Sequence, residues 1–380
     1  MKKLVLTLFA LAVTASAIHA QSGILTDELN PIFTGIPSLT IAPDARAGGM
    51  GDVGAATTPD VFSQHWNPAK YAFMESPAGL AFSYTPWLSQ LVDDINLFYM
   101  VGYWRPDDLQ AFSASIRYFS LGRVILRQHI DDHSGQIANP NEFAFDIAYS
   151  RKLSERFSAS VAFRYIRGDL NVPAQNAEMT EMNPAHAIAA DISAFYTQPI
   201  TMAAGDANLA FGLNISNIGN RVTFDDVTYN FLPTNLRLGT SFDMPIDRYN
   251  RISFNADANK LLVVSGRGSF SEEFNDVTVL QSIFGSFTDG ATFSEQMQRI
   301  MWSVGVEYAY NNQFFLRAGY FHEHFNQGGR RYFTAGAGFR LNVFQLDAGY
   351  VIATTPINPL NNTLRFSLSF DLDGLRDLMN

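Results

Sequence analysis

The chain has 380 residues, with 26 basic side chains against 36 acidic ones and a formal net charge of −10. Charged residues make up only 16% and aromatic residues reach 13%, which excludes intrinsic disorder, because disordered chains are highly charged and poor in aromatics. The acidic balance argues against nucleic-acid binding. The absence of cysteine excludes disulfides, thiolate metal sites and a cysteine nucleophile.

Residues 1–20 have the features of a secretory signal peptide. Two lysines precede an apolar stretch, Leu4–Ile18, that ends in small residues, and this order is typical of an export signal. Cleavage after Ala20 is preferred, and Ala17 offers a second site. Export leaves 24 basic against 36 acidic residues, a mature charge of −12. Beyond this segment, no run of about 20 apolar residues predicts a membrane-spanning helix.

Residues 21–77 show no two-residue alternation and are rich in glycine and proline. A free tail of this length would normally be more charged, so we expect an internal plug or hatch segment inside the barrel predicted below. Glycine lacks a Cβ and therefore permits close backbone approach and positive φ. The residues expected to form this structural plug motif are Gly49, Gly51, Gly54, Trp66, Asn67 and Pro68.

The region 78–372 alternates apolar and polar residues, the pattern of strands with two different faces. In the last segment, Leu364 and Phe366 alternate with Arg365 and Ser367. About fourteen such segments occur, each of roughly 8–13 residues, the length that a tilted strand needs to cross a bilayer. They span residues 78–85, 95–105, 109–121, 143–152, 157–165, 186–198, 207–217, 234–243, 249–258, 302–310, 312–322, 331–341, 343–352 and 364–372.

The connections between these segments alternate in length. The short ones lie at residues 106–108, 153–154, 311 and 342. Short turns at one end and long loops at the other are typical of an outer-membrane barrel. An even number of strands places both termini in the periplasm, including a short tail at 373–380. The expected fold class is all-β, a transmembrane antiparallel β-barrel of about 14 strands, located in the bacterial outer membrane.

A soluble β-sandwich or propeller would also show alternation. The apolar set, however, is dominated by Phe, Tyr, Leu and Val on nearly every strand, and aromatic residues such as Tyr118, Tyr165 and Tyr350 lie towards strand ends. The opposite set is Ser, Gly, Asn, Asp and Arg. A polar interior and interfacial aromatic girdles favour the barrel.

Several chemical motifs favour structural or solvated roles. Gly49, Gly51 and Gly54 match the dinucleotide-binding spacing but lack the surrounding βαβ unit that this motif requires. The polar runs 129–133 and 322–324 carry histidines and carboxylates, yet such loop runs are more often solvated than metal-binding. No Gly-x-Ser-x-Gly element is present. We therefore expect no catalytic residue, no cofactor and no metal.

The long loops carry large apolar residues that are costly to expose and that favour partner contacts. The candidate anchors for cargo or another partner are Trp87, Leu88, Leu91, Phe231, Leu232, Phe284 and Phe287. A structural alternative is equally open for Trp87, which would suit the outer aromatic girdle. The loop at 259–300 is too long to be a mere connection, and loops of such length are usually functional.

Four stretches resemble a known family. Gly-Met-Gly-Asp-Val-Gly at 49–54, followed by Asn-Pro-Ala at 67–69, resembles the FadL-like outer-membrane barrels. More narrowly, residues 44–52, 63–73, 83–88 and 117–122 are similar to the PorV family, whose members are outer-membrane shuttle proteins of the type IX secretion system. The similarity runs from the signal peptide to the last strand.

The resemblance implies a set of partners that no spacing argument reaches. Such proteins bind the folded C-terminal signal domain of secreted cargo at a translocon barrel of the Sov or SprA kind. They carry the cargo to an attachment complex, where a PorU-like sortase joins it to lipopolysaccharide. The resemblance supplies no catalytic residues to transfer, and it implies contacts with outer-membrane lipid but none with nucleic acid.

Two other functions stay open at this point. A FadL-type channel for hydrophobic small molecules would need an apolar lumen pocket and a movable plug. The inward residues are mostly Ser, Gly, Asp and Arg, which argues mildly against it. An outer-membrane enzyme acting on lipid A or phospholipid would be the third possibility, although no motif supports it.

Overall fold

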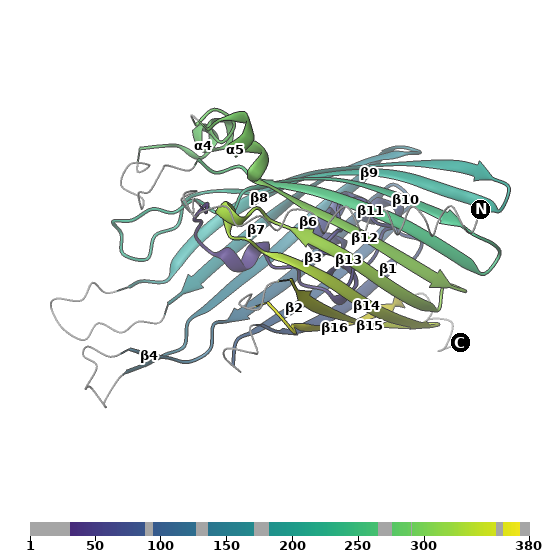
Figure 1. Cartoon of the computed structure of the whole chain (residues 1–380), viewed down its shortest axis with the longest axis horizontal. Coiled ribbons are helices and arrows are strands. Elements are labelled where there is room, and N and C mark those ends of the chain that lie inside the picture. The colour runs from purple at the N-terminus through teal and green to yellow at the C-terminus, as the bar shows by residue number, and fades with distance from the viewer. Residues whose placement is uncertain are drawn as a thin grey trace.

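The computed structural model describes residues 31–87, 94–126, 136–170, 182–264, 276–289, 291–354 and 360–372. The expected signal peptide, the tail 373–380, the histidine run 129–133 and the loop residues Leu88 and Leu91 lie outside these ranges. The element numbers follow Figure 1.

Fourteen antiparallel strands form a closed barrel in which each strand pairs with its neighbours along the chain, and β1 closes against β16 (Figure 1). The barrel strands are β1 (Ala78–Pro86), β2 (Asn96–Asp107), β3 (Gln110–Ser120), β6 (Asn141–Ser154), β7 (Phe157–Asp169), β8 (Ala185–Met202), β9 (Gly205–Gly219), β10 (Asn235–Pro245), β11 (Asn250–Leu261), β12 (Ile300–Tyr310), β13 (Phe314–His322), β14 (Arg331–Leu341), β15 (Phe344–Ala353) and β16 (Leu364–Asp371). The predicted all-β outer-membrane barrel of about 14 strands is confirmed, and each predicted segment corresponds to one barrel strand.

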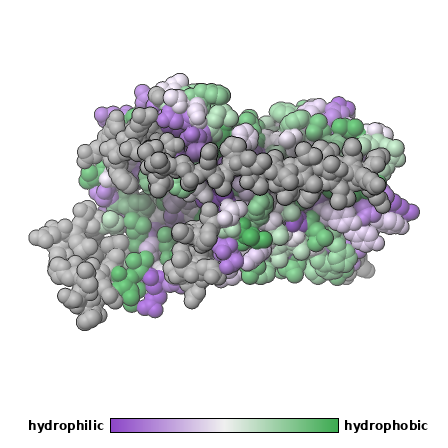
Figure 2. Space-filling view, viewed as in Figure 1, coloured by the Kyte–Doolittle hydropathy of each residue, from purple (hydrophilic) through white to green (hydrophobic). Residues whose placement is uncertain are grey.

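The two-residue period separates the two faces of the wall. In β1, Phe82 and Tyr84 are exposed, while Ser83 and Thr85 between them are buried. On the face shown in Figure 2, hydrophobic residues cover much of the wall and hydrophilic residues gather near its two ends. This distribution matches a barrel whose middle lies in hydrocarbon and whose lumen is polar.

Two elements in the long loops were not predicted. Residues 122–142 contain a short hairpin of β4 (Val124–Leu126) and β5 (Gln136–Ala138). The loop between β11 and β12 contains α4 (Val279–Gly285) and α5 (Phe293–Gln298). Strand β8 also runs to Met202, beyond the predicted end at residue 198, because its pairing with β9 continues to Gly205.

The remaining short helices are η1 (Pro37–Thr40), α2 (Ala45–Gly48), α3 (Ser63–Trp66), η2 (Pro68–Phe73) and η4 (Phe325–Gln327). No helix in the described ranges is long and apolar enough to cross a membrane. Four of these helices belong to residues 31–77, which we name the lumen segment. Its first residues lie beside the long-loop end of the barrel, where Gly35 N donates to Phe231 O at 2.8 Å.

Candidate functional site

The lumen segment lies inside the barrel and touches many strands. Helix α2 contacts β14, β15 and β16, whereas η2 contacts β3, β6, β7 and β8. Most side chains from Ala42 to Ala72 are buried. The segment therefore spans the lumen between opposite walls, and its fit to those walls decides what the barrel interior can do.

Glycines on the inner wall allow the lumen segment to approach the strands at backbone distance. They stand opposite one another in adjacent strands as the pairs Gly212–Gly239, Gly305–Gly319 and Gly336–Gly349. A Cβ at Gly319 would lie 2.1 Å from the Met50 carbonyl carbon, and one at Gly212 would lie 2.0 Å from the Ala55 carbonyl oxygen. Side chains on these strands would push the segment off the wall.

The segment's own glycines meet the same wall. Gly51 has φ +74°, and a Cβ there would lie 2.8 Å from the backbone of Tyr320. A Cβ on Gly49 would lie 3.0 Å from the Cα of Gly336. Gly54 faces the Trp66 ring, to which a Cβ would come within 2.3 Å. All three positions thus combine close contact with burial, and a phosphate-binding loop has no space here.

The Trp66-Asn67-Pro68 element ties the segment to itself and to β8. The Trp66 indole N–H donates to Asp44 at 2.7 Å, and Asp44 also caps α2 by accepting from Ala47 N at 2.8 Å. The Asn67 amide donates to the carbonyls of Ala55 and Ala194, both at 2.9 Å. Pro68 begins η2, where its missing N–H costs nothing.

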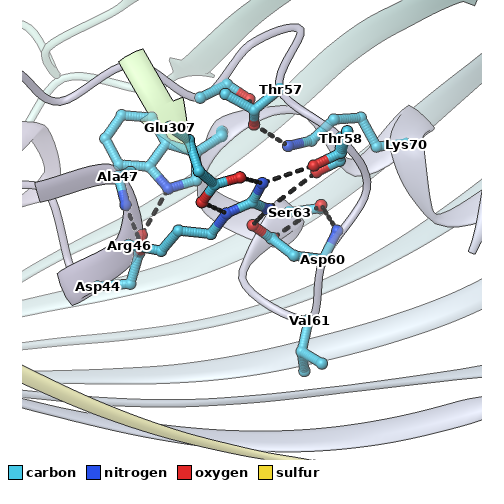
Figure 3. Close-up of polar contacts among 12 residues, drawn as sticks. Asp44, Arg46, Ala47, Thr57, Thr58, Asp60, Val61, Ser63, Lys70 and Glu307 are labelled. Carbon is cyan, nitrogen blue, oxygen red and sulfur yellow. Dashed lines mark hydrogen bonds and ion pairs between the residues drawn. The ribbon is translucent and has the colours of Figure 1, made fainter. Parts of the chain in front are cut away.

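A buried ion-pair network joins the segment to the wall (Figure 3). Arg46 donates from Nε and Nη2 to both oxygens of Glu307 on β12, at 3.1 and 2.9 Å, and from Nη1 to Asp60 at 2.6 Å. On the wall, Arg317 donates to Glu307 and to Asp347, both at 2.6 Å. Removing one member of such a network leaves an uncompensated buried charge, which typically costs about 3–5 kcal/mol.

A second set of polar bonds anchors the neighbouring turn. Asp52 accepts from Arg365 on β16 at 2.5 Å and from the Tyr332 hydroxyl on β14 at 2.6 Å. The backbone N–H groups of Gly54 and Ala55 donate to Asp257 on β11 at 2.8 and 3.0 Å. The segment is thus bonded to at least four strands.

Two buried groups of the segment have shifted pKa values. Burial, reinforced by the charge of Asp60, raises the pKa of Asp44 to about 6. Burial lowers the pKa of Lys70 to about 8, against the opposing effect of Asp60. The Lys70 ammonium donates to Thr57 Oγ1 at 3.0 Å.

The loop between β11 and β12 carries the most exposed apolar surface at the long-loop end. We name α4 and α5 together the loop helices; Figure 1 shows them projecting beyond the wall. Phe293 is 82% exposed, Phe284 71% and Leu280 63%. Phe287 and Met297 are also exposed. These five apolar side chains form an unpartnered surface on the described chain.

Polar contacts at their base fix the loop helices on the barrel. Lys260 at the end of β11 donates to Ser286 O at 3.2 Å and to the Gln296 side chain at 2.9 Å. Arg299 pairs with Asp289 at 2.6 Å, and both side chains are buried. The apolar surface is therefore presented by an anchored element.

The structure separates the predicted anchor residues into three groups. Phe284 and Phe287 lie on the exposed surface of the loop helices. Phe231 and Leu232, expected as exposed anchors, are buried instead at 8% and 1% exposure, because they pack on the start of the lumen segment around Ile36. Trp87 is half-buried and packs on a cluster that includes Phe321 and Leu360, so it belongs to neither an outer girdle nor a free loop tip.

Sequence signals for the loop helices exist but are local. Thr278 and Gln281 form a capping box on α4, and Thr292 and Glu295 form one on α5. A Thr-x-x-Gln or Thr-x-x-Glu spacing before an apolar residue is a recognisable helix start. These two signals would have identified both helices and, with them, the exposed Phe293 and Met297.

Within the described ranges, no group of three or more His, Asp or Glu side chains is arranged to hold a metal ion. The histidines of the run 322–324 are used otherwise. The His322 ring lies 3.3 Å from the Tyr320 hydroxyl, and His324 caps η4 by accepting from Asn326 N. Glu323 between them accepts from Arg330 through both carboxylate oxygens.

A closed, antiparallel, lipid-facing barrel with a polar lumen and exposed loop helices defines an outer-membrane β-barrel of the transport type. The model of the type IX secretion system protein PorV matches residues 25–267. Because that match covers more than half of the chain, the protein belongs to the PorV family, as the sequence resemblance predicted. No curated protein matches the sequence.

Solved structures agree on the fold. A mutant of the monoaromatic hydrocarbon channel TodX matches with a TM-score of 0.54 and 12% identity, covering 86% of this chain and 98% of that one. The toluene transporter TodX of Pseudomonas putida matches with a TM-score of 0.51 and 9% identity, covering 90% and 99%. A FadL homologue of Pseudomonas aeruginosa matches with a TM-score of 0.47 and 12% identity, covering 90% and 99%.

Proposed function

We propose that this barrel is a non-enzymatic component of the type IX secretion system that binds the C-terminal signal domain of secreted cargo. It takes the cargo from a translocon barrel of the Sov or SprA kind to an attachment complex with a PorU-like sortase, beside lipopolysaccharide. Family membership supports the system, and the exposed apolar surface of the loop helices supports a binding role at the cell surface.

The single observation that carries the proposal is the exposure of Phe284 and Phe293 on an anchored element. Exposed aromatic residues at 71% and 82% are unfavourable unless a partner covers them. Interfaces draw most of their energy from a few such anchors, typically about 2 kcal/mol or more each. On this proposal the long-loop end faces outward and both termini are periplasmic.

The alternative of a channel for hydrophobic small molecules has less support. Two cavities lie at the ends of the lumen segment, of about 280 Å³ and about 420 Å³, and among described residues they share none of their lining. Residues bonded to the wall, Arg46 and Asp52 among them, belong to the segment between the two ends. A passage would require these buried bonds to break.

The test is an affinity pull-down from detergent-solubilised outer membranes. The wild-type barrel should co-purify translocon and cargo, and a variant with Phe284→Ser and Phe293→Ser should lose the cargo while it stays heat-modifiable on gels. The matched control is Phe325→Ser, which removes an equally exposed phenylalanine from η4 in another loop. Undiminished cargo recovery by the double variant would contradict the assignment to the loop helices.

A further inference from the structure

The cavity of about 280 Å³ lies at the long-loop end, between the lumen segment and the upper strands. Its floor includes His65 and Trp66 of the lumen segment, and its wall includes Arg237 and Asn235 of β10. Residues from three long loops border it: Trp87, Arg330 and Leu360. The position makes the cavity accessible from the same end as the loop helices.

His65 and Arg237 stand on either side of Trp66. The His65 ring centroid lies 4.7 Å from the Trp66 ring in an edge arrangement, and the Arg237 guanidinium carbon lies 4.5 Å from the centre of the same indole. Both side chains line the cavity. The indole thus holds two hydrogen-bond donors at one place on the cavity surface.

The hydrogen bonding of His65 defines its proton. Its Nδ1 lies 3.0 Å from Nη2 of Arg117, which can only donate. Burial and the neighbouring charges of Arg117, Arg237 and Arg164 keep the pKa of His65 well below its usual range, so the ring is neutral and Nε2 carries the hydrogen. In the described structure that Nε2 is buried and has no acceptor.

Arg237 is the least neutralised guanidinium on this surface. Its nearest carboxylate is Asp257 at 3.6 Å, which already accepts from the backbone of Gly54 and Ala55. Its closest hydrogen bond in the described structure goes to the Asp52 carbonyl at 3.3 Å.

The other lining arginines are engaged with carboxylates at shorter distances. Arg164 pairs with two aspartates, at 3.2 and 3.0 Å, Arg299 pairs with Asp289 at 2.6 Å, and Arg330 pairs with Glu323 at 2.8 Å. Arg237 therefore differs from its neighbours in having guanidinium N–H groups to offer a ligand.

The remaining lining adds two features. Asn235 is 8% exposed, and its side-chain oxygen is an acceptor with no donor in the described structure. The far wall is apolar, with Leu39, Met301, Phe321 and Leu360. A ligand that satisfies all of these groups carries an anionic acceptor, an N–H donor beside it and an apolar stem.

We propose that this cavity binds a carboxylate on a short apolar stem, and that its source is the C-terminal end of a polypeptide. Arginine and a neutral imidazole N–H recognise carboxylate oxygens. A chain end also supplies a backbone N–H for Asn235, which a fatty acid lacks. A cavity of about 150 Å³ holds one benzene molecule, so this one has room for one or two residues rather than a long acyl chain.

The inference rests on the proposed function, because a C-terminal signal domain ends in such a carboxylate. The loop helices would then hold the body of the domain while the cavity reads its last residue. The cavity would distinguish a cargo whose end is free from one whose end is extended or blocked.

The test measures binding of a purified cargo signal domain to the barrel in nanodiscs. The domain is prepared with a free C-terminal carboxylate and, by ligation, with a C-terminal amide. The wild-type barrel should bind the acid at least tenfold more tightly than the amide. Arg237→Gln should bind both forms alike, whereas the matched control Arg340→Gln, which lines the other cavity, should keep the difference.

Equal affinity of acid and amide for the wild-type barrel would overturn the inference while leaving the proposed function intact. Binding of neither form would overturn both. Displacement of the acid by oleate, with no difference between acid and amide, would assign the cavity to fatty acid and overturn the polypeptide source. The acid-against-amide comparison needs no variant, so a folding defect in Arg237→Gln does not prevent a decision.

Discussion

Gly51 shows how one residue couples backbone conformation to the seating of the lumen segment. Its φ of +74° disfavours any side chain, and a Cβ would also lie 2.8 Å from the Tyr320 backbone. Gly329 has a similar φ of +69°, but its Cβ would meet nothing closer than 3.6 Å. The two positions therefore share the conformational strain and differ in the steric clash.

We predict that Gly51→Ala lowers the folded yield more than Gly329→Ala does. Positive φ costs an alanine about 1–2 kcal/mol at both sites, and the clash adds to this only at Gly51. The measurement is the fraction of protein that runs as the compact, unboiled band on a denaturing gel. Equal yields of the two variants would show that the segment does not press on β13.

Lys70 gives a prediction about pH. Its pKa of about 8 in the folded barrel lies below the 10.5 of an exposed lysine. Between these values the unfolded chain binds the proton and the folded one does not, so stability rises with pH across this window. The contribution is present in full above 10.5 and is lost as pH falls through about 8.

The free energy of unfolding of the wild type should therefore rise relative to that of Lys70→Met between pH 8 and 10.5. A shift of this size corresponds to about 3 kcal/mol. Urea unfolding of both proteins over this range measures it, and the difference between them removes the effect of buried tyrosines. A constant difference would mean that Lys70 titrates normally.

At the scale of elements, the ion pairs between Arg46 and β12 hold the lumen segment in place. Glu307→Gln leaves Arg46 and Arg317 buried with one carboxylate fewer, and we expect a loss of about 3–5 kcal/mol. The control is Asp243→Asn, whose partner Arg251 is one-third exposed and whose loss should cost about 1 kcal/mol or less. Thermal midpoints of the gel-mobility transition compare the two, and similar midpoints would contradict a load on Glu307.

The barrel strands could be predicted from the sequence because a strand with a lipid face and a lumen face repeats every two residues, and a meander pairs each strand with the next. The loops carry no such period. Leu232 and Phe284 are both apolar loop residues, yet Leu232 meets Ile36 of the lumen segment and Phe284 meets nothing. That difference depends on contacts far apart in sequence. The helix starts at Thr278 and Thr292 were readable from their capping boxes.

At the scale of the whole molecule, the barrel combines a lumen bonded shut by its own N-terminal segment with an apolar surface outside one end. The first feature disfavours transport through the lumen, and the second favours transport by binding. The glycine pairs of the wall serve the first feature, while Lys260 and Arg299 at the base of the loop helices serve the second.

The central claim is that the loop helices contact the cargo's signal domain in the cell. A photo-crosslinking amino acid placed at Phe293 should form an adduct with that domain. The same group at Phe211, an exposed residue of the outer wall on β9, should form none. Adducts at neither position, or at residue 211 alone, would contradict the account.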